Sequence, residues 1–226
     1  MLFLSASAIC RNPGLLALVL LALLLPARAQ AIDAPDGKRV ADIFLDEVKV
    51  GRQLLSFRHE GRSLIVDDEI DISVPRLRVL AEHYLLRCHE VWRNGALAEI
   101  VTDVNDYGRL AEVDLTETAK GPMIDGAAGQ QPAPQGLVPS SLWSIEMSKG
   151  QPVLDLDSGR VVNPRFSTGP EEPIAVAGDD VPARHVTAAG GLSRELWYGR
   201  DGLLVRQQYR DSKGQLLDFH MRPSAK

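Results

Sequence analysis

The chain has 226 residues, of which 45% are apolar, 24% charged and 5% aromatic, and its formal net charge is −5. These proportions are those of an ordinary globular protein, and they exclude collagen-like repeats, disulfide-dense miniproteins and a mainly disordered chain. The acidic balance argues against a protein that holds nucleic acid on a basic surface, so no nucleic-acid partner is expected.

The N-terminal segment, residues 1–29, is typical of a secretory signal peptide. Residues 15–25 form an unbroken apolar run. A membrane-spanning helix needs about 20 such residues, whereas the central region of a secretory signal needs about 7–15. Small residues follow this run, and they fit a cleavage site after Ala29 or, as the alternative, after Ala31. An uncleaved N-terminal anchor is the competing interpretation.

Cleavage would leave residues 30–226 in the periplasm or outside the cell, without a transmembrane span. That length suits one β-rich domain with a substantial core. Cys88 is the one cysteine in this part of the chain, so an internal disulfide cannot form. We expect Cys88 to be either buried or available for an intermolecular disulfide.

Glycine turns followed by apolar or alternating residues recur along the chain. Gly51 and Gly61 are 10 residues apart, and Gly202 and Gly214 are 12 apart. Turns about 8–12 residues apart are typical of antiparallel all-β folds. Residues 64–72 alternate so that one face is mostly apolar and the other mostly acidic, as in a half-buried strand. The pattern predicts a mainly β fold, a single curved antiparallel sheet or half-barrel built from β-meander hairpins.

Several segments depart from this pattern. Residues 75–87 fit a helical stripe after Pro75 or a long strand running into Trp92, and we favour the strand. Residues 121–139 and 163–182 are rich in proline and glycine and are expected to be loops. Between them, Ser140-Ser141-Leu142-Trp143 can cap a short helix near residues 140–147.

The C-terminal stretch predicts a three-strand meander over residues 192–198, 203–210 and 215–221. Its sequence contains ELWYGRDGLLVRQQYRDSKGQLLDF, and it follows FLDEVKVGRQLLSF, YLLRCHEVWRNGAL and SSLWSIE with LDLDSGRV. This order of motifs resembles the bacterial secreted proteins of domain-of-unknown-function family 6134, over about residues 39–221. The motifs that carry the resemblance best are the turn Glu90-x-Trp92-x-Asn94-Gly95 and the hairpin that begins at Trp197-Tyr198.

The resemblance implies a curved antiparallel sheet, an envelope location and no established activity. A looser likeness in fold connects the chain with curved-sheet periplasmic carriers of lipids and lipoproteins, and this likeness is an analogy of fold alone.

The strand over residues 83–92 carries the most informative polar group. Alternation places Glu90 on one face with Cys88 and Trp92. A carboxylate among apolar side chains would be desolvated and its pKa raised, which makes Glu90 a candidate site residue. The competing interpretation is that Glu90 lies near a strand end and pairs with an arginine across the sheet. Cys88 and His89 point to opposite faces, so they cannot form a nucleophile–base pair.

Other polar motifs favour structural roles. His83 and His89 share a face but lie too far apart along a strand to bind one metal ion. Asp155-Leu-Asp157-Ser-Gly159 begins like a calcium loop, but later ligand positions do not fit, so a turn explains it better. The acidic run over residues 67–69 is expected to be solvated. No catalytic residue, metal ligand or cofactor is predicted.

We therefore expect a non-catalytic periplasmic protein that binds an apolar or lipid-like ligand on the concave face of its sheet. The alternatives are an envelope structural or interaction protein without a small ligand, whose partner is an envelope protein, and an enzyme of unknown reaction with Glu90 as its acid or base. The residues expected to line the ligand site are Tyr84, Leu86, Glu90, Trp92, Trp143, Met147 and Trp197.

Overall fold

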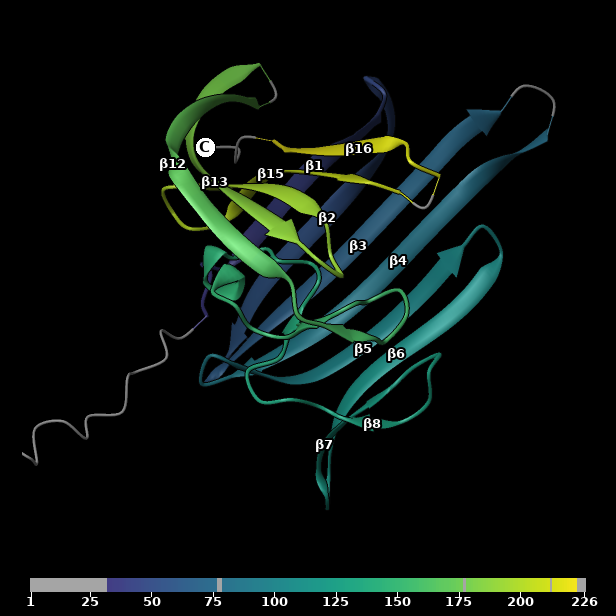
Figure 1. The fold of residues 1–226 in the computed structure, drawn as a ribbon, viewed down its shortest axis with the longest axis vertical. Coiled ribbons are helices and arrows are strands. Elements are labelled where there is room, and N and C mark those ends of the chain that lie inside the picture. Colours follow the sequence, from purple (N-terminus) through teal and green to yellow (C-terminus); the bar gives the residue numbers. More distant parts are fainter. Residues whose placement is uncertain (1–31, 77–78, 177, 212, 223–226) are drawn as a thin grey trace, which may run out of the picture. The chain divides into compact units, whose positions relative to one another are not determined.

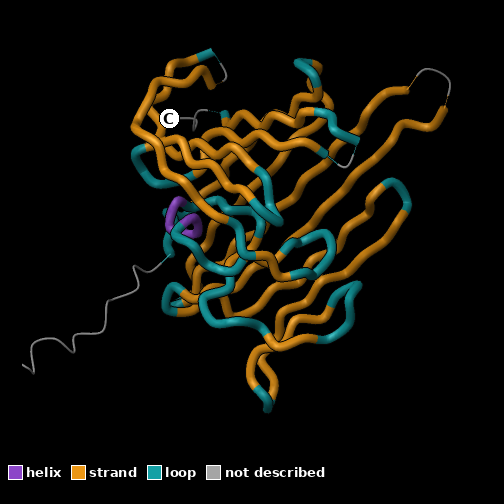
Figure 2. Tube along the Cα trace, in the orientation of Figure 1, coloured by secondary structure: helices purple, strands orange, loops and turns teal. Residues whose placement is uncertain are grey.

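Antiparallel strands make up most of the molecule (Figures 1 and 2). The computed structural model describes residues 32–76, 79–176, 178–211 and 213–222, so the expected signal peptide lies outside the described residues. The strands are β1 (Gly37–Leu45), β2 (Val48–Glu60), β3 (Ser63–Arg76), β4 (Val79–Arg93), β5 (Ala96–Asp106), β6 (Arg109–Thr118), β7 (Gly121–Asp125), β8 (Gln131–Pro132), β9 (Val138–Pro139), β10 (Val153–Leu154), β11 (Val161–Val162), β12 (Arg165–Val176), β13 (Asp179–Ala189), β14 (Arg194–Gly199), β15 (Leu204–Arg210) and β16 (Leu216–Met221).

The main sheet has thirteen strands in the order β12-β13-β14-β15-β16-β1-β2-β3-β4-β5-β6-β7-β8. Every pair in it is antiparallel, and β1 pairs with β16, so the first and last strands lie side by side in the middle of the sheet. The sheet is not closed, and its edges are β12 and β8. The prediction of a mainly β, antiparallel fold is confirmed. None of the described residues forms a helix with the length and apolar character that a bilayer crossing requires.

Alternation along the long strands builds a continuous inner face. Val66 of β3 opposes Glu90 of β4, which opposes Ile100 of β5, and all three are buried. One pleat along, Asp68, Cys88 and Thr102 form a second row. These rows follow from the two-residue period of strands, which sends every second side chain to the same face.

The segment between β8 and β12 fills the interior over much of this inner face. The indole of Trp143 packs edge-on against Phe57 of β2 and Trp92 of β4, with ring centroids 5.2 Å and 5.8 Å apart. On the other side, the backbone N–H of Leu204 in β15 donates to the carbonyl of Trp143 at 2.9 Å. This segment also forms the small sheet β11-β10-β9. The segment therefore contacts strands β2 and β4 on one side and β15 on the other, and Trp143 is almost fully buried between them.

The two segments expected to be loops contain strands, and the second of them is mostly strand. Residues 121–139 contain β7, β8 and β9, and residues 163–182 contain β12 and the start of β13. Proline is tolerated here because β12 is an edge strand and its register shifts between Thr168 and Glu171, next to Pro170. Composition alone could not show this, since proline and glycine mark loops, edges and bulges alike.

The remaining local predictions fare better. Residues 79–93 are a strand, as favoured, although residues 77 and 78 lie outside the described part of the chain. The C-terminal meander is confirmed as β14, β15 and β16. The short helix exists as a 3-10 helix, η2 (Ile145–Ser148), but its cap is Ser144 rather than Ser140 or Ser141.

Candidate ligand-binding cavity

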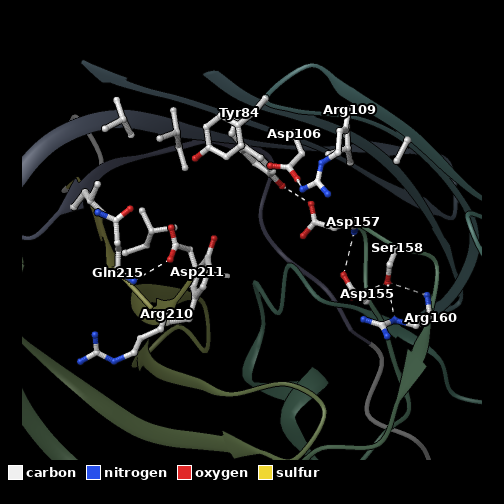
Figure 3. A pocket seen from close by; sticks show the side chains of 18 residues that line it. Tyr84, Asp106, Arg109, Asp155, Asp157, Ser158, Arg160, Arg210, Asp211 and Gln215 are labelled. Carbon is white, nitrogen blue, oxygen red and sulfur yellow. Dashed lines mark hydrogen bonds and ion pairs between the residues drawn. The ribbon is translucent and has the colours of Figure 1, made fainter. Parts of the chain in front are cut away.

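A cavity of about 610 Å³ lies at one end of the inner face, beyond the part that Trp143 fills. Its walls are strands of the main sheet and the turn that joins β10 to β11 (Figure 3). The residues that line it are Leu45, Ile72, Val74, Tyr84, Val104, Asp106, Tyr107, Arg109, Ala111, Asp155, Asp157, Ser158, Arg160, Tyr209, Arg210, Asp211, Gln215 and Leu217.

The side of the cavity formed by the sheet is apolar in part, and the same sheet contributes the charged side chains of Asp106, Arg109 and Arg210. Ile72, Val104 and Leu217 come from three different strands, and each belongs to the main hydrophobic core. They reach the cavity because strand alternation sends them inward. Tyr209 adds an aromatic ring, stacked on Phe219 at a centroid distance of 5.6 Å. This side can receive an apolar group without leaving a buried polar atom unsatisfied.

A hydrogen bond between Tyr84 and Asp157 joins the sheet to the β10–β11 turn. The Tyr84 hydroxyl donates to Oδ1 of Asp157 at 2.6 Å (Figure 3). Asp157 keeps contact with solvent, but the cavity walls replace much of its hydration, and this loss raises the pKa of its carboxyl group. The hydrogen bond from Tyr84 and the positive charge of Arg194 oppose that rise, while the nearby charges of Asp155 and Asp106 add to it.

The other acidic groups of the cavity are already engaged. Asp106 forms an ion pair with Arg109. Asp155 accepts hydrogen bonds from the Ser158 hydroxyl at 2.8 Å and from the backbone N–H of Asp157 at 3.1 Å. Asp211 likewise accepts from two backbone N–H groups of its own turn, at Lys213 and Gln215. Such short-range bonds are typical of Asp in turns and serve the local fold.

Two arginines at the cavity have no acidic partner among the described residues. Arg160 donates from Nε to the Ser158 hydroxyl at 3.3 Å, and Arg210 donates to the carbonyl of Gly214 at 2.8 Å. Both side chains are exposed. In Figure 3 the guanidinium of Arg210 extends away from Asp157. Both groups therefore belong to the rim.

Of the seven residues predicted to line a ligand site, Tyr84 lines this cavity and the other six do not. Leu86, Glu90, Trp92, Trp143 and Met147 come together on the inner face as predicted, but they pack into a filled core with at most 3% of each side chain exposed. The reason is the segment 136–162, which occupies the concave face that the sequence left open.

Trp197 does not join this group at all. It lies on the opposite face of β14 from Leu196 and Tyr198, in a separate small cluster with Ile174 and Val205. Its indole stacks on His185 at 4.7 Å and donates to Glu172 at 3.2 Å. All three residues 196–198 are buried, so alternation could not tell which face Trp197 takes.

Glu90 is fully buried and accepts three hydrogen bonds. Its Oε2 accepts from the indole N–H of Trp92 at 2.8 Å and of Trp143 at 3.0 Å, and its Oε1 accepts from the Ser141 hydroxyl at 2.9 Å. Burial raises the pKa of Glu90 as predicted, and these three bonds oppose the rise. The alternative, an ion pair with an arginine across the sheet, is wrong. Trp92 lies two residues from Glu90 in the same strand, but Ser141 and Trp143 are 51 and 53 residues away, so no local pattern could reveal those two donors.

Asp68 corrects the expectation of a solvated acidic run. Asp67 and Glu69 point outward, but Asp68 is only 2% exposed. Its two oxygens accept from Nε2 of Gln53 at 2.9 Å and 3.0 Å, and burial raises its pKa to about 7. The Oε1 atom of Gln53 has no hydrogen-bond partner among the described residues.

The cysteine and histidines considered for thiol or metal chemistry are buried or paired with carboxylates in the structure. Cys88 is buried and forms no disulfide, and burial raises the pKa of its thiol. Of the two expectations for Cys88, burial is therefore the one that the structure shows. His83 and His89 lie on the outer face and pair with Asp71 and Asp67 at 3.0 Å and 2.7 Å. Within the described ranges, His, Cys, Asp and Glu side chains do not gather into a metal-binding group.

Sequence reasoning missed most of the cavity. It treated Asp155 and Asp157 only as a turn, and it singled out none of the arginines. The signal that could have indicated the site is the Asp-x-Asp-Ser-Gly sequence itself, because an Asp-rich turn beside a hydrophobic strand carries polar groups to an apolar face.

Comparison with known proteins places the chain in a family and supports the fold. The family model of DUF6134, a domain of unknown function, matches residues 42–222. The chain belongs to the DUF6134 family. Among curated protein sequences none matches the chain. The crystal structure of a β-barrel-like protein of the DUF1849 family, a domain of unknown function, from Brucella abortus is similar to this DUF6134 chain. It has 10% sequence identity and a TM-score of 0.60, covering 85% of this chain and 98% of that one.

Proposed function

We propose that this DUF6134 protein is a non-catalytic binding protein of the bacterial cell envelope, which holds one small amphipathic molecule in the cavity beside Tyr84. The single observation that carries the proposal is the cavity of about 610 Å³, whose lining combines apolar side chains of the sheet with polar and charged ones of the sheet and its turns. Pockets of roughly 300–1,000 Å³ are typical of small-molecule sites, and this volume falls within that range.

The distribution of chemistry in the cavity supports an amphipathic ligand. Ile72, Val104 and Leu217 offer apolar contact, while Asp157 and the rim arginines offer polar contact on the other side. A purely polar ligand would gain no binding free energy from the apolar side chains. A purely apolar ligand would remove water from the carboxyl groups without replacing its hydrogen bonds. A molecule with one apolar and one polar end satisfies both walls.

The envelope location is part of the proposal and rests on residues 1–29. Their apolar run and small-residue cleavage pattern are typical of a secretory signal. Osmotic-shock fractionation of the native host, followed by mass measurement of the recovered protein, tests this part. We expect a periplasmic protein that lacks the first 29 residues. A full-length protein in the cytoplasmic fraction would overturn the location.

The binding role is tested by native mass spectrometry of the protein purified from its own periplasm without delipidation. We expect a small molecule at near-stoichiometric amount, which extraction and fragmentation then identify. A clean apo mass, together with no thermal stabilisation by added single-chain amphiphiles, would overturn the binding role.

Adjacent residues of β6 provide a matched pair of variants. Ala111 lines the cavity, whereas Leu110 faces outward with 80% of its surface exposed. Ala111→Phe places a ring in the cavity and should abolish the bound mass, while Leu110→Phe should retain it. Loss in both variants would show that the molecule is bound elsewhere or that the fold is disturbed, and the Tm values of the two variants separate these outcomes.

A second candidate function, an envelope interaction protein without a small ligand, is favoured by the open edge of the sheet. Strand β12 is an edge of 12 residues whose outer backbone groups pair with no described strand. Pro170 and Pro173 interrupt this edge, which limits strand addition by a partner. Crosslinking from a photoreactive residue at position 171, on intact cells, tests this candidate.

A further inference from the structure

We propose that Asp157 selects the ligand, and that the bound molecule is a single-chain amphiphile whose head group is a cation that donates hydrogen bonds, such as a primary amine. This inference rests on the proposed function. It adds the chemical class of the ligand and names the residue that recognises it.

The first step is the unused oxygen of Asp157. Its Oδ1 accepts the Tyr84 hydroxyl, but Oδ2 accepts no hydrogen bond from any described residue. In Figure 3 the Asp157 carboxyl extends from the β10–β11 turn toward Tyr84, across the space between turn and sheet. The Tyr84 bond fixes the direction of the carboxyl group and leaves one oxygen available to a ligand.

The second step is that Asp157 is the least engaged acid of the cavity. Asp106 forms an ion pair with Arg109, and Asp155 and Asp211 are held by hydrogen bonds from their own turns. No described cation lies within ion-pair distance of Asp157. A charged carboxylate in such surroundings gains most from a partner that brings a positive charge and N–H donors.

The third step concerns the sign of the local field. Asp155 and Asp106 both act on Asp157 in the direction that opposes its ionisation, whereas the charge of Arg194 acts in the direction that favours it. A ligand cation beside Asp157 would relieve this repulsion, whereas a carboxylate or phosphate head group would add to it. The rim arginines do not reverse this argument, because Arg210 extends away from Asp157 and Arg160 is exposed beyond Ser158.

The fourth step is size. A cavity of about 610 Å³ falls in the range for one drug-sized molecule. The filled core around Trp143 closes the inner face beyond the cavity, so a lipid with several long chains finds no further room there. One chain against Ile72, Val104 and Leu217, with its head at Asp157, fits both walls.

The experiment compares three ligands that share a ten-carbon chain: decylamine, decanol and decanoate. Each is used below its micelle concentration at pH 7.5 to displace a neutral fluorescent apolar probe, N-phenyl-1-naphthylamine, from the full mature protein. We expect decylamine to displace the probe at a concentration at least about tenfold lower than decanoate, because a charge-assisted hydrogen bond is worth at least that factor. Decanol should fall between them.

Three variants separate recognition from general charge. Asp157→Asn keeps the shape and the Tyr84 hydrogen bond but removes the charge, and it should bring decylamine and decanoate to within about threefold of each other. Asp103→Asn makes the same change in net charge on the outer face of β5, and it should leave the preference intact. Tyr84→Phe keeps the Asp157 charge and should preserve the preference for decylamine.

The outcomes distinguish this inference from the proposed function. If neither the probe nor any of the three ligands binds, the proposed function fails. If all three bind with equal strength, or if decanoate binds best and Asp157→Asn changes nothing, the cavity binds amphiphiles but the role of Asp157 is overturned. If Asp103→Asn abolishes the preference as fully as Asp157→Asn does, the preference reflects net charge and the inference is overturned.

Discussion

Glu90 and Asp157 are both carboxylates held by aromatic donors, and they have opposite roles. Glu90 accepts from two indoles and a hydroxyl, so both of its oxygens are used, and it is 0% exposed. Asp157 accepts from one tyrosine and keeps an oxygen toward the cavity. A buried carboxylate with all partners present organises a core, whereas one with a vacant oxygen at a cavity can recognise a ligand.

The comparison shows that burial and a raised pKa are not sufficient to indicate a functional site. The surroundings raise the pKa of both groups. What separates them is access, since Glu90 lies under Trp143 and lines no part of the cavity. The number of hydrogen bonds that each carboxylate oxygen accepts is therefore a better indicator of a functional site than the direction of the pKa shift.

The largest expected effect is on stability at Glu90. Glu90→Ala leaves two buried indole N–H groups and the Ser141 hydroxyl without their acceptor and opens a void. We expect the free energy of unfolding to fall by about 5 kcal/mol, measured by urea denaturation. Glu99→Ala, on the outer face of β5 and 3.9 Å from Arg93, should cost less than about 1 kcal/mol. A loss of stability in Glu90→Ala as small as that of the control would contradict the role of Glu90 in organising the core.

A smaller effect should appear in the pH dependence of stability through Asp68. The folded protein raises the pKa of Asp68 to about 7, far above its ordinary value in the unfolded chain. Between about pH 4 and pH 7 the folded state then holds a proton that the unfolded state has released, so stability falls as pH rises through this window. The expected loss between pH 5 and pH 8 is roughly 2–3 kcal/mol, measured as the difference between the urea midpoints at these two pH values.

Asp68→Asn provides the control for this pH effect. It removes the titrating group while keeping a similar shape beside Gln53, so the difference between the two urea midpoints should shrink to the part contributed by other groups. Asp42, whose pKa Arg222 lowers to about 2, titrates below this window and does not mask the result. A midpoint that rises from pH 5 to pH 8 would contradict the assignment.

The smallest effect is expected at Tyr84→Phe. The variant removes the hydroxyl that binds Asp157, but Asp157 reaches solvent and can exchange that bond for water. The expected loss of stability is below about 1 kcal/mol by urea denaturation. A loss as large as that of Glu90→Ala would show that the Tyr84–Asp157 bond is part of the core and would remove the contrast between the two carboxylates.

The sequence predicts the scaffold well because strands leave local signals. Alternation over residues 64–72 and glycine turns such as Gly61 and Gly214 indicate antiparallel hairpins, and β2, β3, β15 and β16 follow. It also groups Glu90, Trp92 and Trp143, and hydrogen bonds join these three side chains in the structure. Their function could not follow, because whether a concave face is filled depends on the path of residues 136–162, which is set by long-range contacts.

The cavity was harder to predict for the same reason. Tyr84 and Asp157 are 73 residues apart, and their bond exists only because the β10–β11 turn returns to β4. Trp197 shows the converse limit. Three consecutive buried residues give no period, so an aromatic side chain cannot be assigned to one face of a strand that is covered on both.

The pairing of β1 with β16 has a consequence for how the chain folds. Asp42 and Arg222 form an ion pair across 180 residues of sequence, and Ala41 pairs with Met221. Such long loops close slowly, so the central seam of the sheet cannot form until the last strand has been synthesised. A chain with this strand order leaves the β1 side of the seam unpaired until β16 is available. Deleting β16 should therefore yield a protein that never completes its sheet.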